Sequence, residues 1–170
     1  MERRSRYPDR RIGRGGFGLM ELVVVLAIVG VMAAIAVPRY ANSLARFRVD
    51  GAARRIVADL AMARASARQA SQGTAVLFDV AGDRLTIPSV QNMNSSTAVY
   101  EDRLGDAPYN VSLVSANFGG SAQVTFDGYG MPNADGTVVV QVGTIQKTVS
   151  LSKVTGLATI QPEVNIASGN

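Results

Sequence analysis

Glu21 is the residue that most clearly requires a charged partner, because it is the only charged residue between Phe17 and Val37. As a helix, this stretch extends about 31 Å, which is enough to span the hydrocarbon core of a bilayer. A carboxylate near the start of such a segment costs free energy, up to about 3 kcal/mol near the bilayer centre and less toward its edge. The nearest compensating cation is the new amino terminus of Phe17 that cleavage after Gly16 would create. The predicted chemistry of Glu21 is therefore charge pairing.

The rest of the chain lacks the residues that most often carry catalysis. It holds no Cys and no His, and no Ser lies in a Gly-x-Ser-x-Gly turn, so no nucleophile–base pair can be assembled. Asp127, Asn133 and Asp135 supply oxygens across a Gly-rich loop and form a weak calcium candidate, although the Asp-x-Asp-x-Asp spacing is missing. We favour the alternative that they accept backbone hydrogen bonds in turns. We expect no enzyme activity, no metal and no cofactor.

The basic charge of the chain is concentrated at its amino terminus. An isoelectric point of about 9.8 is compatible with a nucleic-acid partner. However, residues 1–16 hold six Arg with Glu2 and Asp9, a net charge of +4, which equals the formal charge of the whole chain. The remainder is formally neutral, so charge gives no argument for nucleic acid. A basic leader of this kind keeps the amino terminus on the cytoplasmic side of a membrane.

The amino-terminal residues resemble a known processing signal. A short basic leader ends in Gly16, Phe17 follows, Glu21 stands at the fifth position, and an apolar helix leads to Pro38. This combination closely resembles the class III signal of type IV pilins and pseudopilins. The resemblance implies that a prepilin peptidase cuts after Gly16 and methylates the amine of Phe17, and that Glu21 pairs with a terminal amine as subunits join a filament. Gly18 departs from the family, which most often has Thr there.

Two other interpretations of the apolar segment stay open. It is compatible with an ordinary signal anchor in which Glu21 is tolerated near the headgroups. It is also compatible with a secretory signal peptide, since Ala34–Ile35–Ala36 forms an A-x-A cleavage site. Cleavage after Ala36 would release a soluble β-domain, for example a ligand-binding one. The length of the apolar run, Glu21 inside it and Pro38 as the second mature residue argue against this alternative.

Beyond Pro38, apolar residues recur near helical spacing. They are Tyr40, Leu44, Phe47, Ala52, Ile56, Leu60, Ala63, Ala67 and Ala70. The pattern predicts one helix over residues 18–72, with a bend at Pro38 and a stop at Gly73. The alanines at 63, 67 and 70 are expected to lie close against a sheet. Arginines fall between the apolar positions; they either contact anionic lipid or neighbouring subunits, or form a solvated helix face, which we favour.

From Thr74 the hydrophobic period changes to two, which is typical of strands. We expect about eight short strands, with a hairpin turn at 81–83, a polar loop at 89–96 and a polar tail over 161–170. The alternation of Val138, Val140 and Val142 marks the clearest strand. No further helix is predicted. The expected fold is α+β: a long amino-terminal membrane-spanning helix packed through its carboxyl-terminal half on a pair of antiparallel sheets, or β-sandwich.

The carboxyl-terminal half extends the family resemblance. Residues 124–132, the valine strand with its hairpin return and residues 153–157 resemble the pattern of GspH/FimT-type minor pseudopilins, whose globular part is a β-sandwich packed on the helix. The implied segments are a leader at 1–16, a transmembrane and assembly helix at 17–38, an amphipathic continuation at 39–73 and a β-rich globular part at 74–170.

The resemblance also implies partners and a location. The partners are a prepilin peptidase, other pseudopilins or pilins in a filament, and inner-membrane lipid. The location is the inner membrane, crossed once, with the globular part in the periplasm. FimT-like relatives bind DNA through basic residues near the carboxyl end, but residues 161–170 hold no Lys or Arg. Because phosphate contacts supply most non-specific affinity, we expect no nucleic-acid partner.

Overall fold

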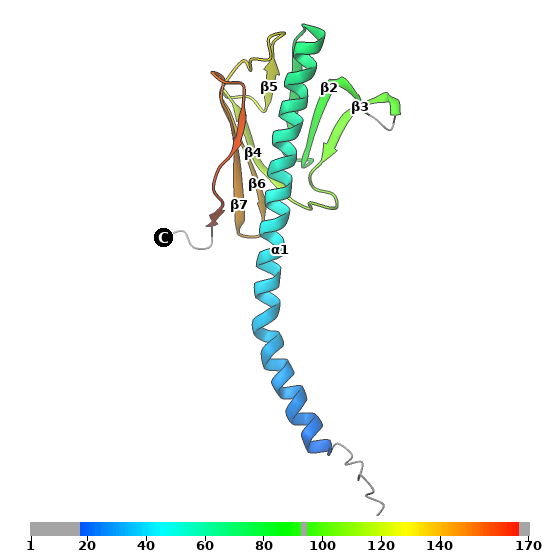
Figure 1. Ribbon diagram of the computed structural model, residues 1–170, viewed down its shortest axis with the longest axis vertical. Coiled ribbons are helices and arrows are strands. Elements are labelled where there is room, and N and C mark those ends of the chain that lie inside the picture. Colours follow the sequence, from blue (N-terminus) through cyan, green and yellow to red (C-terminus); the bar gives the residue numbers. More distant parts are fainter. Residues whose placement is uncertain (1–17, 93–94, 167–170) are drawn as a thin grey trace, which may run out of the picture. The chain divides into compact units, whose positions relative to one another are not determined.

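The computed structural model of the protein describes residues 18–92 and 95–166. Within these ranges it shows one α-helix followed by β-strands, which confirms the α+β class (Figure 1). Helix α1 runs over Leu19–Ala70 and includes Pro38. The chain divides into two compact units between Arg39 and Tyr40. The bend expected at Pro38 stays a prediction.

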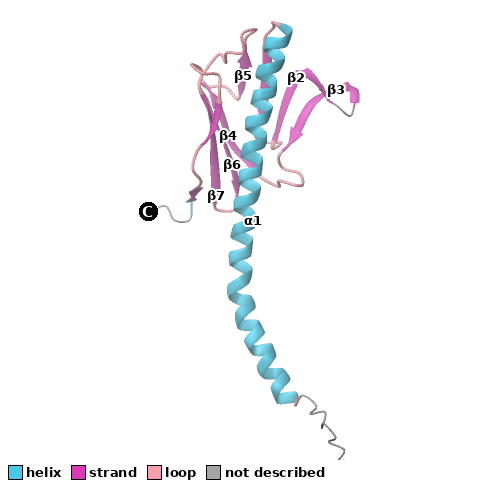
Figure 2. Cartoon of the chain, viewed as in Figure 1, coloured by secondary structure: helices cyan, strands magenta, loops and turns pink. Residues whose placement is uncertain are grey.

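The strands of the second unit form two antiparallel sheets (Figure 2). The first sheet has the order β3-β2-β1-β5, and the second has the order β4-β6-β7-β8, with β9 also paired to β7. The bounds are β1 Thr74–Asp79, β2 Arg84–Asn92, β3 Ser95–Arg103, β4 Ser112–Phe118, β5 Gln123–Phe126, β6 Gly136–Val142, β7 Ile145–Leu151, β8 Ala158–Ile160 and β9 Val164–Asn165. The predicted hairpin turn at 81–83 joins β1 to β2, and the valine strand is β6.

Two segments predicted to be loop are instead paired strands. Most of the expected polar loop at 89–96 lies in β2 and β3, because their hairpin continues through a register shift between Ile87 and Gln91. Backbone pairing across a bulge does not require apolar alternation, so the polar sequence concealed it. The expected polar tail contains β9, where Ile145 pairs with Asn165. Both corrections have the same cause, since residues 89–92 of β2 and residues 164–165 of β9 pair through their backbones without burying a side chain.

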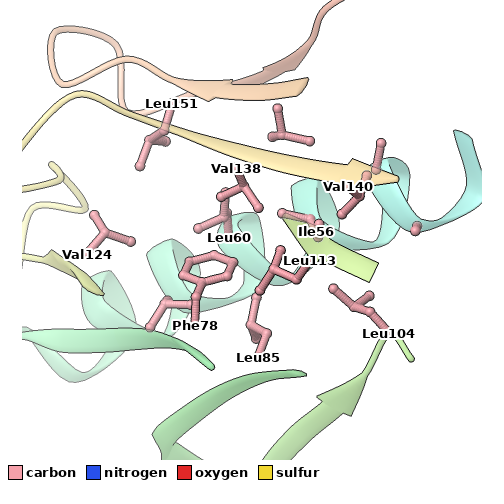
Figure 3. Packing of buried hydrophobic residues seen from close by; sticks show 14 of the residues in the cluster. Ile56, Leu60, Phe78, Leu85, Leu104, Leu113, Val124, Val138, Val140 and Leu151 are labelled. Atoms are coloured by element: carbon pink, nitrogen blue, oxygen red, sulfur yellow. The ribbon is translucent and has the colours of Figure 1, made fainter. Parts of the chain in front are cut away.

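The second half of α1 and both sheets share one hydrophobic core (Figure 3). Ile56 and Leu60 of α1 are fully or almost fully buried. Their side chains pack with those of Phe78 and Leu85 from the first sheet and Val138 from the second (Figure 3). The helix therefore supplies the apolar surface that holds the two sheets together.

Small residues allow this close packing. Ala52, Ala53, Ala63 and Ala67 have no exposed surface, so the helix backbone approaches the sheets with little side-chain volume between them. The sheets also contact each other directly, since the rings of Phe78 in β1 and Phe118 in β4 stack with centroids 5.4 Å apart. Aromatic pairs of this kind add about 0.5–1.5 kcal/mol beyond their buried area.

The buried face of α1 is shorter than the sequence pattern predicted. It begins at Val49 and ends at Ala67. Tyr40 and Phe47, expected on this face, are 72% and 78% exposed, and Ala70 is exposed as well. Helical spacing places residues on a common face but does not say how far along that face the sheets extend.

The helix ends before the predicted stop at Gly73. Ser71 takes a left-handed backbone conformation, with a φ of 52°. The amide of Gln72 donates to the carbonyl of Ala67, and the amide of Ser71 donates to that of Arg68. These two bonds define a Schellman motif, in which glycine usually holds the left-handed position. Ser71 holds it here, so Gly73 was the wrong choice of cap.

Replacing Ser71 by Gly is expected to stabilise the domain. A left-handed conformation costs a non-glycine residue about 1–2 kcal/mol, and part of the gain is lost to the flexibility of glycine in the unfolded chain. We predict that Ser71→Gly raises the free energy of unfolding by about 0.5–1 kcal/mol. Urea unfolding of the detergent-solubilised chain, followed by circular dichroism, measures this change. Ser71→Ala keeps the Cβ atom and serves as the control; equal stability of the two variants would contradict the assignment.

Candidate functional sites: an apolar helix segment and a buried polar cluster

The first half of α1 is apolar except for Glu21, and no other described residue covers it. Its most apolar 18-residue window has a mean hydropathy of 2.7, and none of that window is buried. Side chains between Leu19 and Val37 remain broadly exposed, from 82% at Leu19 to 44% at Val25. Among the described residues, α1 is the one helix long and apolar enough to cross a membrane. Such a surface calls for lipid or other apolar helices around it.

Glu21 lies in the first turn of this helix. The helical hydrogen bonds begin immediately around it, where the amide of Leu22 donates to the carbonyl of Gly18 (3.1 Å). The partial positive charge of a helix amino terminus favours a carboxylate at this position. Gly16 and Phe17, the residues of the expected cleavage site, lie outside the described residues. The pairing of Glu21 with a terminal amine therefore stays a prediction.

The three residues of the weak calcium candidate use their oxygens in backbone hydrogen bonds. Asp127 Oδ1 accepts from the amides of Tyr129 and Met131 (2.9 and 2.8 Å). Asn133 Oδ1 accepts from Thr125 and shapes the same connection. The side chain of Asp135 turns elsewhere; its Oδ1 accepts from the amide of Lys153 (2.7 Å).

Several arginines of α1 contact other parts of the second unit. Arg64 donates to the carbonyls of Gly130 and Thr155, and Arg46 forms an ion pair with Glu163. Arg54 pairs with Asp50 one turn away on the same helix, and Asp50 also pairs with Lys147 of β7. The arginines therefore do more than form a solvated face, because some of them fasten loops and the carboxyl-terminal segment to the helix.

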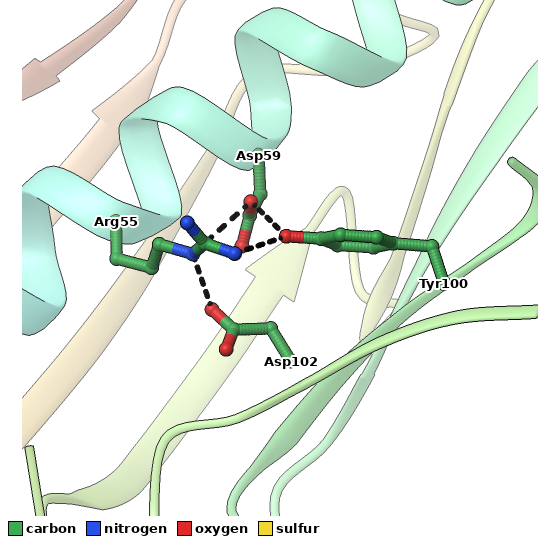
Figure 4. A network of polar contacts seen from close by, with 4 residues as sticks. All are labelled: Arg55, Asp59, Tyr100 and Asp102. Carbon is green, nitrogen blue, oxygen red and sulfur yellow. Dashed lines mark hydrogen bonds and ion pairs between the residues drawn. The ribbon is translucent and has the colours of Figure 1, made fainter. Parts of the chain in front are cut away.

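A partly buried polar cluster, which the sequence interpretation missed, joins α1 to β3 (Figure 4). Tyr100 donates its hydroxyl hydrogen to Asp59 Oδ1 (2.7 Å). Arg55 donates through Nε to Asp102 Oδ2 (2.9 Å) and through Nη2 to the Tyr100 hydroxyl oxygen (2.6 Å). The Nε atom of Arg55 also lies 3.5 Å from Asp59 Oδ1. One guanidinium thus faces two carboxylates.

The sequence contained a signal for this cluster. Asp59 lies three residues after Ile56 and four before Ala63, so it belongs to the apolar face of the helix. A carboxylate at such a position needs a partner because burying an isolated charge costs several kcal/mol. Its partners come from β3, and no rule of local spacing could name them.

Burial has a large effect on the protonation of Asp59. Removal from water raises the pKa of Asp59 to about 7, and the nearby Asp102 carboxylate acts in the same direction. The hydrogen bond from Tyr100 and the charge of Arg55 lower the pKa but do not compensate. Burial and the bond to Asp59 also raise the pKa of Tyr100. The cluster is therefore close to gaining or losing one proton at neutral pH.

We predict that Asp59 makes the stability of the domain depend on pH between about 4 and 7. The native carboxyl keeps its proton up to about pH 7, whereas the unfolded chain releases it near the ordinary value of 3.8. The native state therefore binds more protons in this window, and the free energy of unfolding falls as the pH rises, by at most about 1.4 kcal/mol per pH unit.

Urea unfolding of the wild-type chain and of Asp59→Asn at several pH values tests this expectation. The variant has no titrating group at this position and should show a flatter profile between pH 4 and 7. Asp79→Asn is the matched control, because the ion pair with Arg84 lowers the pKa of Asp79 and moves its effect below this window. Parallel profiles of wild type and Asp59→Asn would contradict the assignment.

Comparison with known proteins identifies one family and several related proteins. Residues 52–155 match the family described as Type II transport protein GspH. The type IV minor pilin FimU of Pseudomonas aeruginosa (strain PAO1) shares the fold with a TM-score of 0.52 and 21% identity, over 69% of this chain and 90% of that chain. The minor pseudopilin EpsH from the Type 2 Secretion System of Vibrio cholerae gives 0.51 and 16%, over 67% and 96%.

A curated relative matches a shorter stretch more closely. The Type IV major fimbrial protein FimA of Dichelobacter nodosus is 54% identical over 35 residues. The match spans only about a fifth of each protein, 21% of this chain and 22% of FimA. The GspH match, by contrast, extends over more than half of this chain. Since the fold is also that of a minor pilin, the chain belongs to the GspH family of pilin-like proteins.

Proposed function

We propose that the chain is a minor pilin or pseudopilin subunit that enters the filament of a type II secretion system or a type IV pilus. The observation that carries this proposal is the uncovered apolar half of α1, followed in the same chain by a GspH-family domain. An apolar surface of this extent is stable only against lipid or other apolar helices. The same surface serves first as a membrane anchor and then as a packing surface between subunits.

The proposed subunit has four segments. Residues 1–16 are a leader, 17–38 a transmembrane and assembly helix, 39–73 its amphipathic continuation and 74–170 the β-rich part. The six arginines of the leader hold it on the cytoplasmic side, so the chain crosses the inner membrane once and the globular part lies in the periplasm. Lipid is the first partner of the helix, and neighbouring pilins replace it during assembly.

Processing by a prepilin peptidase precedes the replacement of lipid by neighbouring pilins around the helix. Cleavage between Gly16 and Phe17 removes the basic leader and frees the amine of Phe17, which is then methylated. The support for this step is the leader pattern in the sequence, with Gly16, Phe17 and Glu21 in the register of the pilin signal. The new ammonium belongs to Phe17, four residues before Glu21 in the sequence.

Pairing between Glu21 and a terminal ammonium favours assembly more than insertion. In a low-dielectric setting the attraction amounts to several kcal/mol, although desolvation of both groups offsets much of it. A single subunit in lipid can keep Glu21 near the headgroups or protonate it. In a filament the carboxylate is enclosed by apolar helices, and an ammonium of its own or a neighbouring chain then becomes the available partner.

The role is structural rather than catalytic. A GspH-family domain attached to an apolar helix supports a subunit whose β-rich part faces outward and meets neighbouring subunits. The cargo or channel of the secretion machine is a further partner of this outward face.

Glu21→Ala is expected to separate processing from assembly. Cleavage depends on the leader and Gly16, and removal of a charge favours insertion, so the variant should be cut and should stay in the membrane. Its crosslinking to other pilins in cells should fall about tenfold for each 1.4 kcal/mol of lost pairing. Glu21→Asp should lie between the two because its carboxylate is one methylene shorter.

Glu101→Ala is the control for this experiment, since it removes a carboxylate from the β-rich part of the chain. It should assemble as the wild type does. The readout is the crosslinked fraction divided by the amount of processed protein in the membrane. Wild-type assembly of Glu21→Ala would refute the role of this carboxylate, whereas failure of the wild-type chain to crosslink with any pilin would refute the proposed function.

A further inference from the structure

A small groove lies between α1 and the hairpin of β2 and β3. It has a volume of about 240 Å³, and its lining includes Arg55, Asp59 and Met62 of α1, Val90 and Gln91 of β2, and Tyr100 of β3. One water molecule occupies about 30 Å³ in the liquid, so the groove exceeds the size of a single bound water. It has room for a side chain or a small ligand.

One wall of the groove is formed by a carboxylate with an unused oxygen. The side chain of Asp59 is only 3% exposed. Its Oδ1 atom accepts the bond from Tyr100, whereas Oδ2 is buried and has no hydrogen-bond partner among the described residues. A buried polar atom without a partner costs about 1–3 kcal/mol, and more when it is charged. Native proteins rarely leave such an atom unsatisfied.

The charge of the cluster favours a cation at this oxygen. Asp59 and Asp102 share the single guanidinium of Arg55, so the cluster carries one excess negative charge once Asp59 has lost its proton, and a bound cation favours that loss. The apolar lining favours an aliphatic chain behind that cation, since Met62 and Val90 pack against the hydrophobic core at the edge of the groove. An aliphatic arm with a cationic end is the shape of an arginine or lysine side chain.

We propose that this groove receives one arginine or lysine side chain from a neighbouring pilin subunit, whose cationic group bonds to Asp59 Oδ2. The inference rests on the proposed function, because it requires a filament that brings a neighbour to this surface. The side chain lays its methylene groups on Met62 and Val90 and completes the cluster of Arg55, Asp59 and Asp102. The groove thereby recognises one basic residue of the neighbouring subunit.

Binding of a small cation to the full chain in a neutral maltoside micelle tests the chemistry of the groove. The probe is n-butylguanidinium, and its neutral isostere n-butylurea is the matched control. The ¹³C-methyl resonance of Met62 reports the groove, and that of Met131, which lies at a different groove, reports non-specific effects. We expect a saturable shift at Met62 with the cation, at least tenfold weaker binding of the urea, and no shift at Met131.

Two substitutions identify the group that binds. Asp59→Asn keeps the shape of the side chain and should weaken binding of the cation at least tenfold, whereas Asp79→Asn should leave it unchanged. Equal binding of the cation and the urea, or unchanged binding to Asp59→Asn, would overturn the proposal.

Crosslinking in cells tests the partner. A photoreactive residue in place of Gln91 is expected to capture another pilin subunit, and Asp59→Asn should reduce this capture several-fold. A photoreactive residue in place of Met32, in the apolar half of α1, reports membership of the filament independently. Capture from position 32 with no Asp59-dependent capture from position 91 would reject the groove alone. Loss of capture from both positions in the wild type would reject the proposed function as well.

Discussion

The structure depends on one constraint, namely that α1 has two halves that need different surroundings. From Val49 to Ala67 one face of the helix is enclosed by two sheets. From Leu19 to Val37 the helix is exposed, with no cover from the described residues. The free energy of exposing the second stretch to water is large, so a bilayer or other helices must cover it. The second unit holds a complete core of its own, which leaves the apolar stretch available for partners.

The two carboxylates of α1 show how charge is handled in each half. Glu21 has no cationic partner in the described part of the apolar segment, and the proposed partner is an amine that processing creates. Asp59 has its partners in the same unit, where Tyr100 and Arg55 bind one of its oxygens. The second oxygen of Asp59, Oδ2, has no hydrogen-bond partner among the described residues, so it too needs a partner from elsewhere. Glu21 is exposed in the structure and would lose water only in lipid or in a filament, whereas Asp59 is already buried; each carboxylate then favours a cation from outside its own local structure.

The sequence predicted the long helix, the change to strands at Thr74 and the hairpin between β6 and β7, because each has a clear hydrophobic period. It did not predict the full length of the β2–β3 hairpin at 84–103, since the polar residues of these strands pair through backbone atoms and leave no apolar alternation in the sequence. The cap at Ser71 was missed because glycine is the usual left-handed residue and Gly73 stood nearby. The Asp59 cluster depends on contacts between residues more than 40 positions apart, and only the fold brings these together.

The central claim is that a cut after Gly16 turns an anchored precursor into a filament subunit with a charged amine beside Glu21. The most direct measurement is the intact mass of the protein extracted from membranes, together with sequencing of its amino-terminal fragment by mass spectrometry. The account predicts a chain that begins with N-methylated Phe17. A mature chain that begins at Val37 would instead indicate release by signal peptidase, and an uncut chain that begins at Met1 would indicate a simple anchor; either result would contradict the account.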